Sequence, residues 1–251
     1  MRGKKILFLC DAHLGSGTNE ELKGRVLSDF IDRMPQRGVS TLYILGDLFD
    51  FWFEYESVIL SRYFHFLTAL SGAVKSGIEV HLIVGNHDYW AGDFLRNTIG
   101  MKIHYAPIEI ELDGRRIFIC HGDGLNEYDR GYLVLKAIIR NRAILWFVRW
   151  VHPDLLLRIA KRFSRFSRQS TSVAGKLRED EGIQQYARRK LEEGFDIVIA
   201  GHSHMPHDET ISIDGKARRY FNVGDMQEQF SYLEYVDGKF QLKYLKAGQE
   251  G

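Results

Sequence analysis

Carboxylate, amide and imidazole side chains occur in five short segments of the chain, each directly after an apolar run. A single segment of this kind after a strand is often only a loop, but five of them are hard to explain by chance. Five of the ten histidines of the chain lie in these segments. The segments hold Asp11 and His13, Asp47 and Asp50, Asn86, His87 and Asp88, His121 and Asp123, and His202 and His204. Together they predict a metal centre.

The donor set indicates which metals and which reaction to expect. Oxygen and nitrogen donors without a thiolate favour Mn²⁺, iron or Zn²⁺ over an iron–sulfur cluster or a structural zinc site. The candidate ligands are too many for one ion and suit two. Two metal ions about 3.5–4 Å apart, bridged by a carboxylate, hydrolyse phosphoesters, and bound metal lowers the pKa of water to about 7. The other histidines are expected on the surface or in satisfied core positions: His65, His81, His104, His152 and His207.

The elements that must position these side chains are parallel strands joined by helices. Apolar runs predict strands at Lys4–Cys10, Leu42–Leu45 and Ile78–Val84. Amphipathic periodicity predicts a helix at Glu20–Met34, and the composition of Val58–Lys75 predicts another. The order strand, helix, strand, helix, strand implies a parallel sheet with right-handed crossovers. Open α/β sheets bind ligands beyond the carboxyl ends of their strands. We therefore expect the five segments at one edge of one sheet.

The second half of the chain adds antiparallel strands and a helical insertion. Asp113-Gly114, Asp214-Gly215 and Asp237-Gly238 each separate two apolar runs and predict hairpins with two-residue turns. A further strand is expected at Phe195–Ala200. Residues 128–191 have a helical composition throughout, with Pro153 expected to break it.

The composition is typical of an ordinary globular protein and argues against a nucleic-acid-binding or membrane-spanning protein. The 251 residues are 45% hydrophobic and 27% charged, with a net charge of +1, which gives no global reason to expect nucleic acid. The two cysteines, Cys10 and Cys120, lie in apolar runs and suit a reducing compartment. Neither a signal peptide nor a membrane-spanning stretch is expected. We expect a cytoplasmic protein with at most a peripheral contact to a membrane.

Five motifs in a fixed order resemble the calcineurin-like metallophosphoesterase superfamily over residues 6 to about 224. They are D-x-H at Asp11, G-D-x-x-D at Gly46, G-N-H-D at Gly85, a lone histidine at His121 and G-H-x-H at Gly201. The resemblance implies an α/β fold, a layered metallophosphoesterase sandwich of mixed β-sheets flanked by helices.

The resemblance also implies roles for individual residues. A first metal would be held by Asp11, His13, Asp47 and His204, and a second by Asp47, Asn86, His121 and His202, with Asp47 bridging. His87 would be catalytic, facing the phosphate as an acid or electrophile oriented by Asp88. Asp50 would lie behind a metal ligand and fix its tautomer.

The segment after His121 bears on the substrate. Between Arg130 and Gln169 it has ten basic residues and one acidic residue, Asp154, interleaved with many large apolar residues. A helical subdomain with a solvated basic face, a nucleic-acid surface, and a pocket for an amphiphile remain open from the residues alone. The apolar excess suits a phosphate backbone poorly, so no nucleic-acid partner is expected. It suits acyl chains, and the basic residues suit phosphate or anionic lipid headgroups.

The pattern from His121 to Tyr132, together with GDLFDFW and the run from Arg162 to Arg168, resembles the UDP-2,3-diacylglucosamine pyrophosphohydrolase family of lipid A biosynthesis. This resemblance implies water attack at the α-phosphorus, giving UMP and 2,3-diacylglucosamine 1-phosphate, in a Mn²⁺ enzyme, with iron or zinc as alternatives. Many members read G-N-R-D where this chain has His87, and the middle of the Arg162–Arg168 run also differs. The matching positions implied in substrate binding are Asp129, Tyr132, Arg162, Ser167 and Arg168.

The expected organisation is a core of residues 1–124 and 191–251 with a helical cap insertion at residues 125–190, whose apolar interior would receive the acyl chains. The expected partner is a lipid-linked nucleotide sugar, with a peripheral contact to the inner membrane surface and no obligate protein partner. Two alternatives are a phosphoesterase for another phosphodiester or a nucleotide, and a non-catalytic scaffold on the same fold. A scaffold should have lost ligands, and all of the implied ligands are present here.

Overall fold

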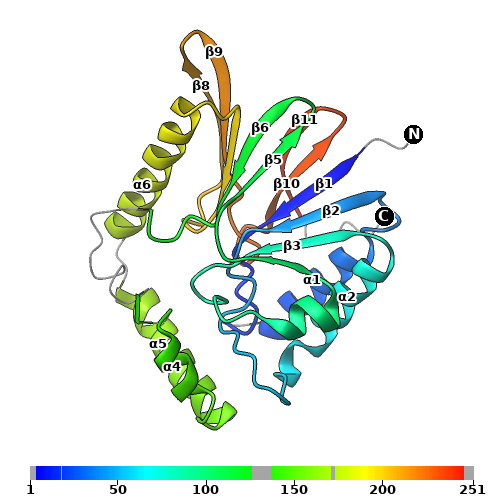
Figure 1. Ribbon diagram of the computed structural model, residues 1–251, viewed down its shortest axis with the longest axis vertical. Helices are drawn as coiled ribbons and strands as arrows, with labels where there is room; N and C mark the ends of the chain where they lie inside the picture. The colour runs from blue at the N-terminus through cyan, green and yellow to red at the C-terminus, as the bar shows by residue number, and fades with distance from the viewer. Residues whose placement is uncertain (1–3, 18, 126–136, 139, 171–172, 246–251) are drawn as a thin grey trace.

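The first sheet has the parallel centre that the sequence predicts. The computed structural model describes residues 4–17, 19–125, 137–138, 140–170 and 173–245. The strand order is β11-β10-β1-β2-β3-β4, with β1 to β4 parallel and β10 antiparallel to both β1 and β11 (Figure 1). The strands are β1 (Lys5–Leu9), β2 (Val39–Ile44), β3 (Glu79–Ile83), β4 (Lys102–His104), β10 (Ser231–Val236) and β11 (Lys239–Tyr244).

The second sheet is also mixed, with the order β5-β6-β7-β9-β8. Its three central strands β6, β7 and β9 are parallel, and β5 and β8 are antiparallel edge strands. The strands are β5 (Ile108–Leu112), β6 (Arg115–Ile119), β7 (Ile197–Ala200), β8 (His207–Ile213) and β9 (Lys216–Asn222).

Helices cover the outer faces of the two sheets. Helices α1 (Glu20–Asp32) and α2 (Phe64–Lys75) bury their apolar stripes against the first sheet, in one cluster with residues such as Leu9 and Leu42. Helix α6 (Val173–Glu192) packs on the second sheet through residues such as Ile183. The inner faces of the two sheets pack on each other through a third cluster. The fold is therefore the predicted α/β layered sandwich of mixed sheets flanked by helices.

The three predicted hairpin turns are confirmed. Each aspartate has a positive φ of 48° to 52°, and each following glycine has a φ of 72° to 83°. Two successive positive φ values define the turn that matches the twist of paired strands, and glycine adopts this conformation without a steric penalty. The turn residues therefore fix the register of β5 with β6, β8 with β9, and β10 with β11.

The predicted helix at Val58–Lys75 begins later than expected. Leu60 is extended and buried, a 3₁₀ turn follows at η1 (Ser61–Tyr63), and α2 begins at Phe64. A short π-helix, η2 (Phe94–Ile99), and β4 were not predicted. The turn before η2 is stabilised by a residue far away in the sequence. The Glu54 carboxylate accepts hydrogen bonds from the backbone of Gly92 and Phe94. Local periodicity carries no signal of such a contact.

The described part of the segment before α6 includes helices α4 (Arg142–Val148) and α5 (Pro153–Ser170). The Asn141 side chain caps α4 by accepting a hydrogen bond from the Ala143 backbone. Pro153, expected to break the helix, is the first residue of α5, where a missing N–H costs nothing. Figure 1 shows α4 and α5 away from both sheets, whereas α6 lies against the second sheet.

A histidine pair on the first sheet makes stability depend on pH. His81 Nδ1 lies 3.0 Å from His104 Nε2. Burial and the neighbouring His104 lower the pKa of His81 from 6.5 to about 4. The unfolded chain therefore binds this proton more readily than the folded chain does. The free energy of unfolding consequently falls as the pH decreases from 6.5 towards 4.

We expect His81→Gln to weaken this pH dependence, because glutamine keeps a polar group but does not titrate. The loss of unfolding free energy between about pH 7.5 and about pH 5 should be about 2 kcal/mol smaller in the variant. Urea denaturation of both proteins at the two pH values measures the difference. Other titrating groups are common to both proteins and cancel. Equal losses would contradict the assigned pKa of His81.

Candidate metal centre

The five predicted segments meet at one place, but they come from two sheets and not from one. The expectation of a single sheet edge is wrong, because β1, β2 and β3 belong to the first sheet while β6 and β7 belong to the second. Within each sheet, neighbouring segments are joined by backbone hydrogen bonds. Asp11 N donates to Gly46 O, His13 N donates to Asp47 O, and Gly201 N donates to His121 O. The sandwich thus brings both groups of strand ends to a shared centre.

Unusual backbone conformations concentrate at this centre. Five of the predicted ligands have a positive φ: 51° at Asp11, 41° at His13, 49° at Asp47, 73° at His202 and 59° at His204. Such conformations cost free energy in residues other than glycine and persist where the surrounding structure enforces them, commonly at functional sites. The strained turns direct these side chains toward one another.

Two glycines allow the strand ends to approach closely. A Cβ on Gly85 would lie 2.2 Å from Asp47 Oδ1, and one on Gly201 would lie 1.9 Å from Cys10 Sγ. Neither position has space for a side chain. The glycines of the G-N-H-D and G-H-x-H motifs are therefore required for packing between turns.

We expect Gly85→Ala to lower the free energy of unfolding by about 2–3 kcal/mol, because the new methyl group overlaps Asp47. Urea denaturation measures the loss. The control is Gly72→Ala, a position on α2 where a Cβ meets no atom within 4 Å. This control should gain roughly 0.5–1 kcal/mol from helix propensity. A Gly85→Ala protein as stable as the parent would show that the two turns can separate.

Asp47 lies at the middle of the centre and is buried. Its Oδ2 is 3.5 Å from His121 Nε2, 3.8 Å from His13 Nε2 and 3.9 Å from His87 Nε2. Its Oδ1 accepts a hydrogen bond from the His87 backbone. Burial alone would raise the pKa of Asp47, but His121 and His87 hold it well below its usual range. Asp47 is therefore a carboxylate with several nitrogens facing one oxygen.

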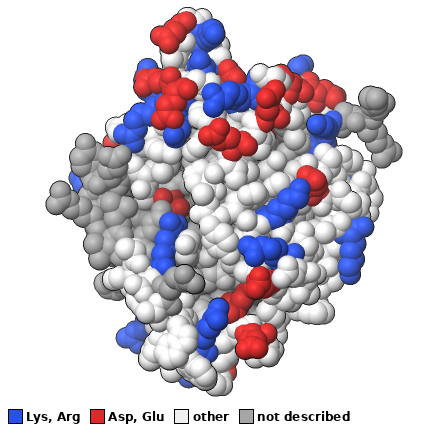
Figure 2. All heavy atoms as spheres, viewed as in Figure 1, with Lys and Arg blue, Asp and Glu red and all other residues white. Residues whose placement is uncertain are grey.

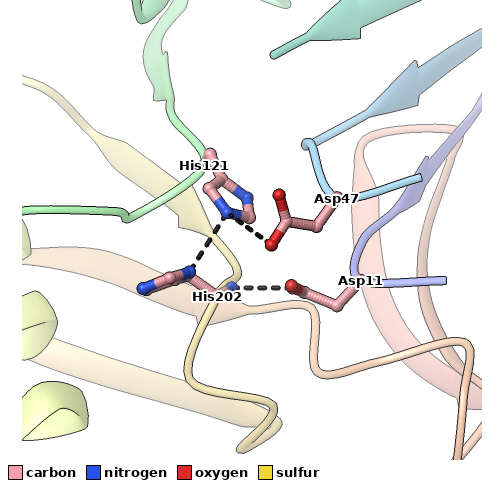
Figure 3. A group of neighbouring side chains, drawn as sticks. All are labelled: Asp11, Asp47, His121 and His202. Atoms are coloured by element: carbon pink, nitrogen blue, oxygen red, sulfur yellow. Dashed lines mark hydrogen bonds and ion pairs between the residues drawn. The ribbon is translucent and has the colours of Figure 1, made fainter. Parts of the chain in front are cut away.

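Backbone carbonyls set the orientation of two histidines. A carbonyl can only accept, so His121 Nδ1 donates to Leu45 O at 2.5 Å and His87 Nδ1 donates to Asp50 O at 2.7 Å. The Nε2 atom of each ring then faces Asp47. His202 Nδ1 lies 3.1 Å from His121 Nε2. Figure 3 shows the rings of His121 and His202 and the carboxylate of Asp47 pointing toward one another, with Asp11 bonded to the His202 backbone.

Asp11, His13 and His204 form an adjoining group. Asp11 Oδ1 is 3.5 Å from both His13 Nε2 and His204 Nε2, and the two nitrogens are 3.3 Å apart. Burial would raise the pKa of Asp11, but the facing His204 and His13 lower it. Like Asp47, this carboxylate is set up to remain ionised among imidazoles.

The chemistry of these groups fits divalent cations. Asp11 Oδ1 and Asn86 Oδ1 are buried oxygens that accept no hydrogen bond from the described residues. Buried acceptors of this kind are costly unless a cation or a donor meets them. Three sets of ligand atoms lie within 4.8 Å of one another: Asp11, Asp47, His121 and His202; Asp11, His13 and His204; and His13, Asp47 and His87. Carboxylate, amide and imidazole donors at this density suit a metal site.

Comparison with known proteins agrees with this chemistry. Residues 4–206 match the family model described as Calcineurin-like phosphoesterase. The chain belongs to the calcineurin-like phosphoesterase family. It is accordingly a metal-dependent hydrolase that uses divalent metal ions.

Curated relatives of this phosphoesterase carry a specific name. A UDP-2,3-diacylglucosamine hydrolase from Porphyromonas gingivalis is 29% identical over 248 residues, covering 91% of this chain and 92% of the relative. One from Pseudomonas putida is 26% identical over 239 residues, covering 94% and 97%. A novel archaeal phosphodiesterase of known structure covers 96% of this chain at 16% identity and a TM-score of 0.49.

Two further predicted residues hold the turns of this phosphoesterase together. The Asp88 carboxylate accepts hydrogen bonds from the backbone of Gly85 and Leu48, and thereby joins the G-N-H-D turn to the G-D-x-x-D turn. Burial and the nearby Asp47 charge raise the pKa of Asp88 to about 7. Asp50 supplies its carbonyl to His87, while its carboxylate accepts a hydrogen bond from Ser164 on α5.

The predicted substrate-binding residues are described only in part. Arg162 lies on α5 with an exposed side chain. The side chains of Ser167 and Arg168, and the whole of Asp129 and Tyr132, lie outside the described residues. These roles stay predictions.

Two carboxylates beside the centre were not predicted from the sequence. Asp225 Oδ2 lies 3.6 Å from His204 Nδ1, and Glu179 Oε1 lies 2.9 Å from His202 Nε2. Asp225 ends the FNVGD segment, in which Asn222 and Gly224 are as typical of a structural turn as of a loop near a functional site. Glu179 stands in a run of charged helical residues and carries no motif. Only the tertiary structure brings these residues to the ligand histidines.

Proposed function

We propose that this phosphoesterase hydrolyses the pyrophosphate of UDP-2,3-diacylglucosamine, with water attacking the α-phosphorus to give UMP and 2,3-diacylglucosamine 1-phosphate. The observation that carries the proposal is the similarity, over more than nine-tenths of the chain, to hydrolases named for this substrate. Carboxylate and imidazole groups that lie close enough together to hold metal ions support it.

The site residues divide into two ligand sets with a shared carboxylate. Asp11, His13, Asp47 and His204 would hold one ion, and Asp47, Asn86, His121 and His202 would hold the other. The short distances among Asp11, His13 and His204, and from His121 to Asp47 and His202, support this division. The buried Asn86 Oδ1, which accepts no hydrogen bond from the described residues, supports its place in the second set. Mn²⁺ is the expected metal, with iron or zinc as alternatives. When bound, the metal pair supplies a water of lowered pKa and neutralises phosphate charge.

His87 and Asp88 complete the catalytic machinery. The Asp50 carbonyl orients the His87 ring, so that its Nε2 faces the site beside Asp47. There His87 stabilises charge on the phosphate or donates a proton to the leaving group. Asp88 fixes the turn that carries His87, and Asp50 links the site to α5.

The lipid side of the substrate belongs to the insertion at residues 125–190. Helices α4 and α5 expose large apolar side chains, and the only acidic residue on them is Asp154. The apolar side chains receive the acyl chains, and the basic residues favour phosphate. Asp129, Tyr132, Arg162, Ser167 and Arg168 contact the sugar and its phosphate.

The same helices make a peripheral contact with the cytoplasmic face of the inner membrane. Trp146, Phe147 and Trp150 are 63%, 65% and 76% exposed. Figure 2 shows the lower end of the molecule, where α4 and α5 lie in Figure 1, as largely uncharged, with both basic and acidic side chains beside it. Aromatic side chains flanked by basic ones bind anionic lipid surfaces. None of the helices that the structure describes has the length and apolar character to span a bilayer.

We expect a variant with Trp146, Phe147 and Trp150 all changed to serine to bind anionic phospholipid vesicles at least about tenfold more weakly, because it loses apolar contact area. Co-sedimentation with vesicles measures the binding. The control is Phe64→Ser, which removes an equally exposed aromatic side chain from α2. Equal loss in both proteins, or none in either, would contradict the assigned membrane surface.

A turnover assay on metal-stripped protein with Mn²⁺ restored tests the function. The substrates are UDP-2,3-diacylglucosamine, its deacylated form and a simple phosphodiester. We expect UMP release only with metal, and a kcat/KM for the acylated substrate at least about 100-fold higher, because burying each methylene group contributes about 0.8 kcal/mol.

Hydrolysis of the simple diester without preference for the lipid would agree with a phosphoesterase reaction. It would contradict UDP-2,3-diacylglucosamine as the specific substrate. Metal-loaded protein inactive on all three would instead support a scaffold.

A further inference from the structure

The two ring nitrogens of His202 have different surroundings. Nδ1 lies 3.1 Å from His121 Nε2, within the group around Asp47. On the opposite side of the ring, Nε2 lies 2.9 Å from Glu179 Oε1. A carboxylate accepts only, so Nε2 carries the proton and donates it to Glu179. Nδ1 is then left with a lone pair facing the site.

Glu179 does not belong to the loop that carries His202. It lies on α6, in the insertion before β7, and its side chain is 38% exposed. The His202 ring is nearly buried. Glu179 therefore extends from the protein surface to a nearly buried ring of the site. This contact differs from an ordinary surface ion pair, in which both partners are exposed.

Helix α6 is rigidly placed for this contact. Ile183, one turn after Glu179, is buried in the cluster under the second sheet. The neighbouring Asp180 accepts a hydrogen bond from Ser203 at 2.6 Å, and its other oxygen lies 3.0 Å from His207 Nε2. Asp180 thereby contacts the side chains of Ser203, within the G-H-x-H motif, and of His207 just after it, while Glu179 contacts the His202 ring.

We propose that Glu179 is a positioning residue of the metal centre, whose carboxylate fixes the His202 ring so that Nδ1 faces the metal. The inference rests on the proposed ligand role of His202. Metal-binding histidines usually donate their second N–H to a carboxylate or carbonyl, which orients the ring and increases the basicity of the ligand. Losing such a partner typically weakens metal binding about 10- to 100-fold.

The test is a titration of metal-stripped protein with Mn²⁺ alone, followed by calorimetry and without substrate. We expect Glu179→Ala to weaken one of the two Mn²⁺ sites about 10- to 100-fold and to leave the other unchanged. Glu179→Gln keeps a carbonyl acceptor at the same place and should restore most of the affinity. The matched control is Glu181→Gln, an exposed acidic residue two positions along the same helix, and it should bind as the parent does.

A double-mutant cycle with His202→Ala separates positioning from general electrostatic attraction. If Glu179 acts through His202, then adding Glu179→Ala to His202→Ala should weaken Mn²⁺ binding no further. Additive losses would overturn the proposal, as would unchanged affinity in Glu179→Ala. If Glu179→Ala fails to fold, the Glu179→Gln and His202→Ala variants test the proposal. The Mn²⁺ affinity of Glu179→Gln then has to lie within about fivefold of the parent affinity.

The result does not depend on the substrate. A parent protein that binds two Mn²⁺ ions but cleaves no lipid substrate would contradict the proposed function and leave the inference about Glu179 standing. A parent protein that binds no Mn²⁺ would overturn the inference.

Discussion

Replacing Asp47 with asparagine should abolish hydrolysis, with a loss of at least about 1,000-fold in kcat/KM. The reason is that Asp47 is the proposed shared ligand of both metals, and bound metals contribute several kcal/mol to stabilising the transition state. Asp47 Oδ2 faces three histidine nitrogens within 3.9 Å, and no other carboxylate of the centre does so among the described residues. Asparagine has the same shape and can still accept the hydrogen bond from the His87 backbone. The fold should therefore persist while the metals are lost.

The measurement combines metal content with thermal unfolding. We expect the variant to hold at most one metal ion per chain after dialysis, against two in the parent. The control is Asp113→Asn, which changes an exposed aspartate in a hairpin turn away from the centre. An Asp47→Asn protein that keeps both ions and its activity would rule out Asp47 as the bridge.

Replacing His87 with alanine should lower kcat by about 10²- to 10⁴-fold while both metals stay bound, because a group that transfers a proton or neutralises phosphate charge typically contributes this much. The orientation of the ring is the reason for expecting catalysis instead of coordination. Its Nδ1 is committed to the Asp50 carbonyl, and its Nε2 is 3.9 Å from Asp47.

Metal analysis and steady-state kinetics on the same sample separate the two roles. His65→Ala, at an exposed position on α2, serves as the matched control and should be fully active. Loss of a metal ion in His87→Ala would show that His87 is a ligand, as its grouping with His13 and Asp47 also allows.

The sequence was sufficient for features that local chemistry controls. Hairpin turns such as Asp113-Gly114 could be predicted because a two-residue turn needs two successive positive φ values, and Asp-Gly is one of the few pairs that adopt them readily. The cluster of polar strand-end residues was predictable because an ionisable group directly after a buried strand is costly without a function. The role of these residues as metal ligands stays a prediction.

Features that depend on contacts between residues far apart in the chain could not be predicted from the sequence. The assignment of all five segments to one sheet was wrong, since nothing local distinguishes a strand of the first sheet from one of the second. The late start of α2 follows from burial of the extended Leu60, which periodicity does not report. Glu179 and Asp225 were missed for the same reason, because an acid becomes a histidine partner only when a remote element brings the two together.

The origin of the ligands in both sheets has a consequence for how the protein matures during synthesis. His13 and His204 are neighbours in space but 191 positions apart in the chain. The amino-terminal half alone contains only part of each proposed ligand set. If these sets bind the metals, both can be completed only after β7 and the loop after it have been synthesised, and a chain truncated before residue 201 should bind metal more weakly than the whole chain. Metal binding would then stabilise only those chains in which both sheets have assembled.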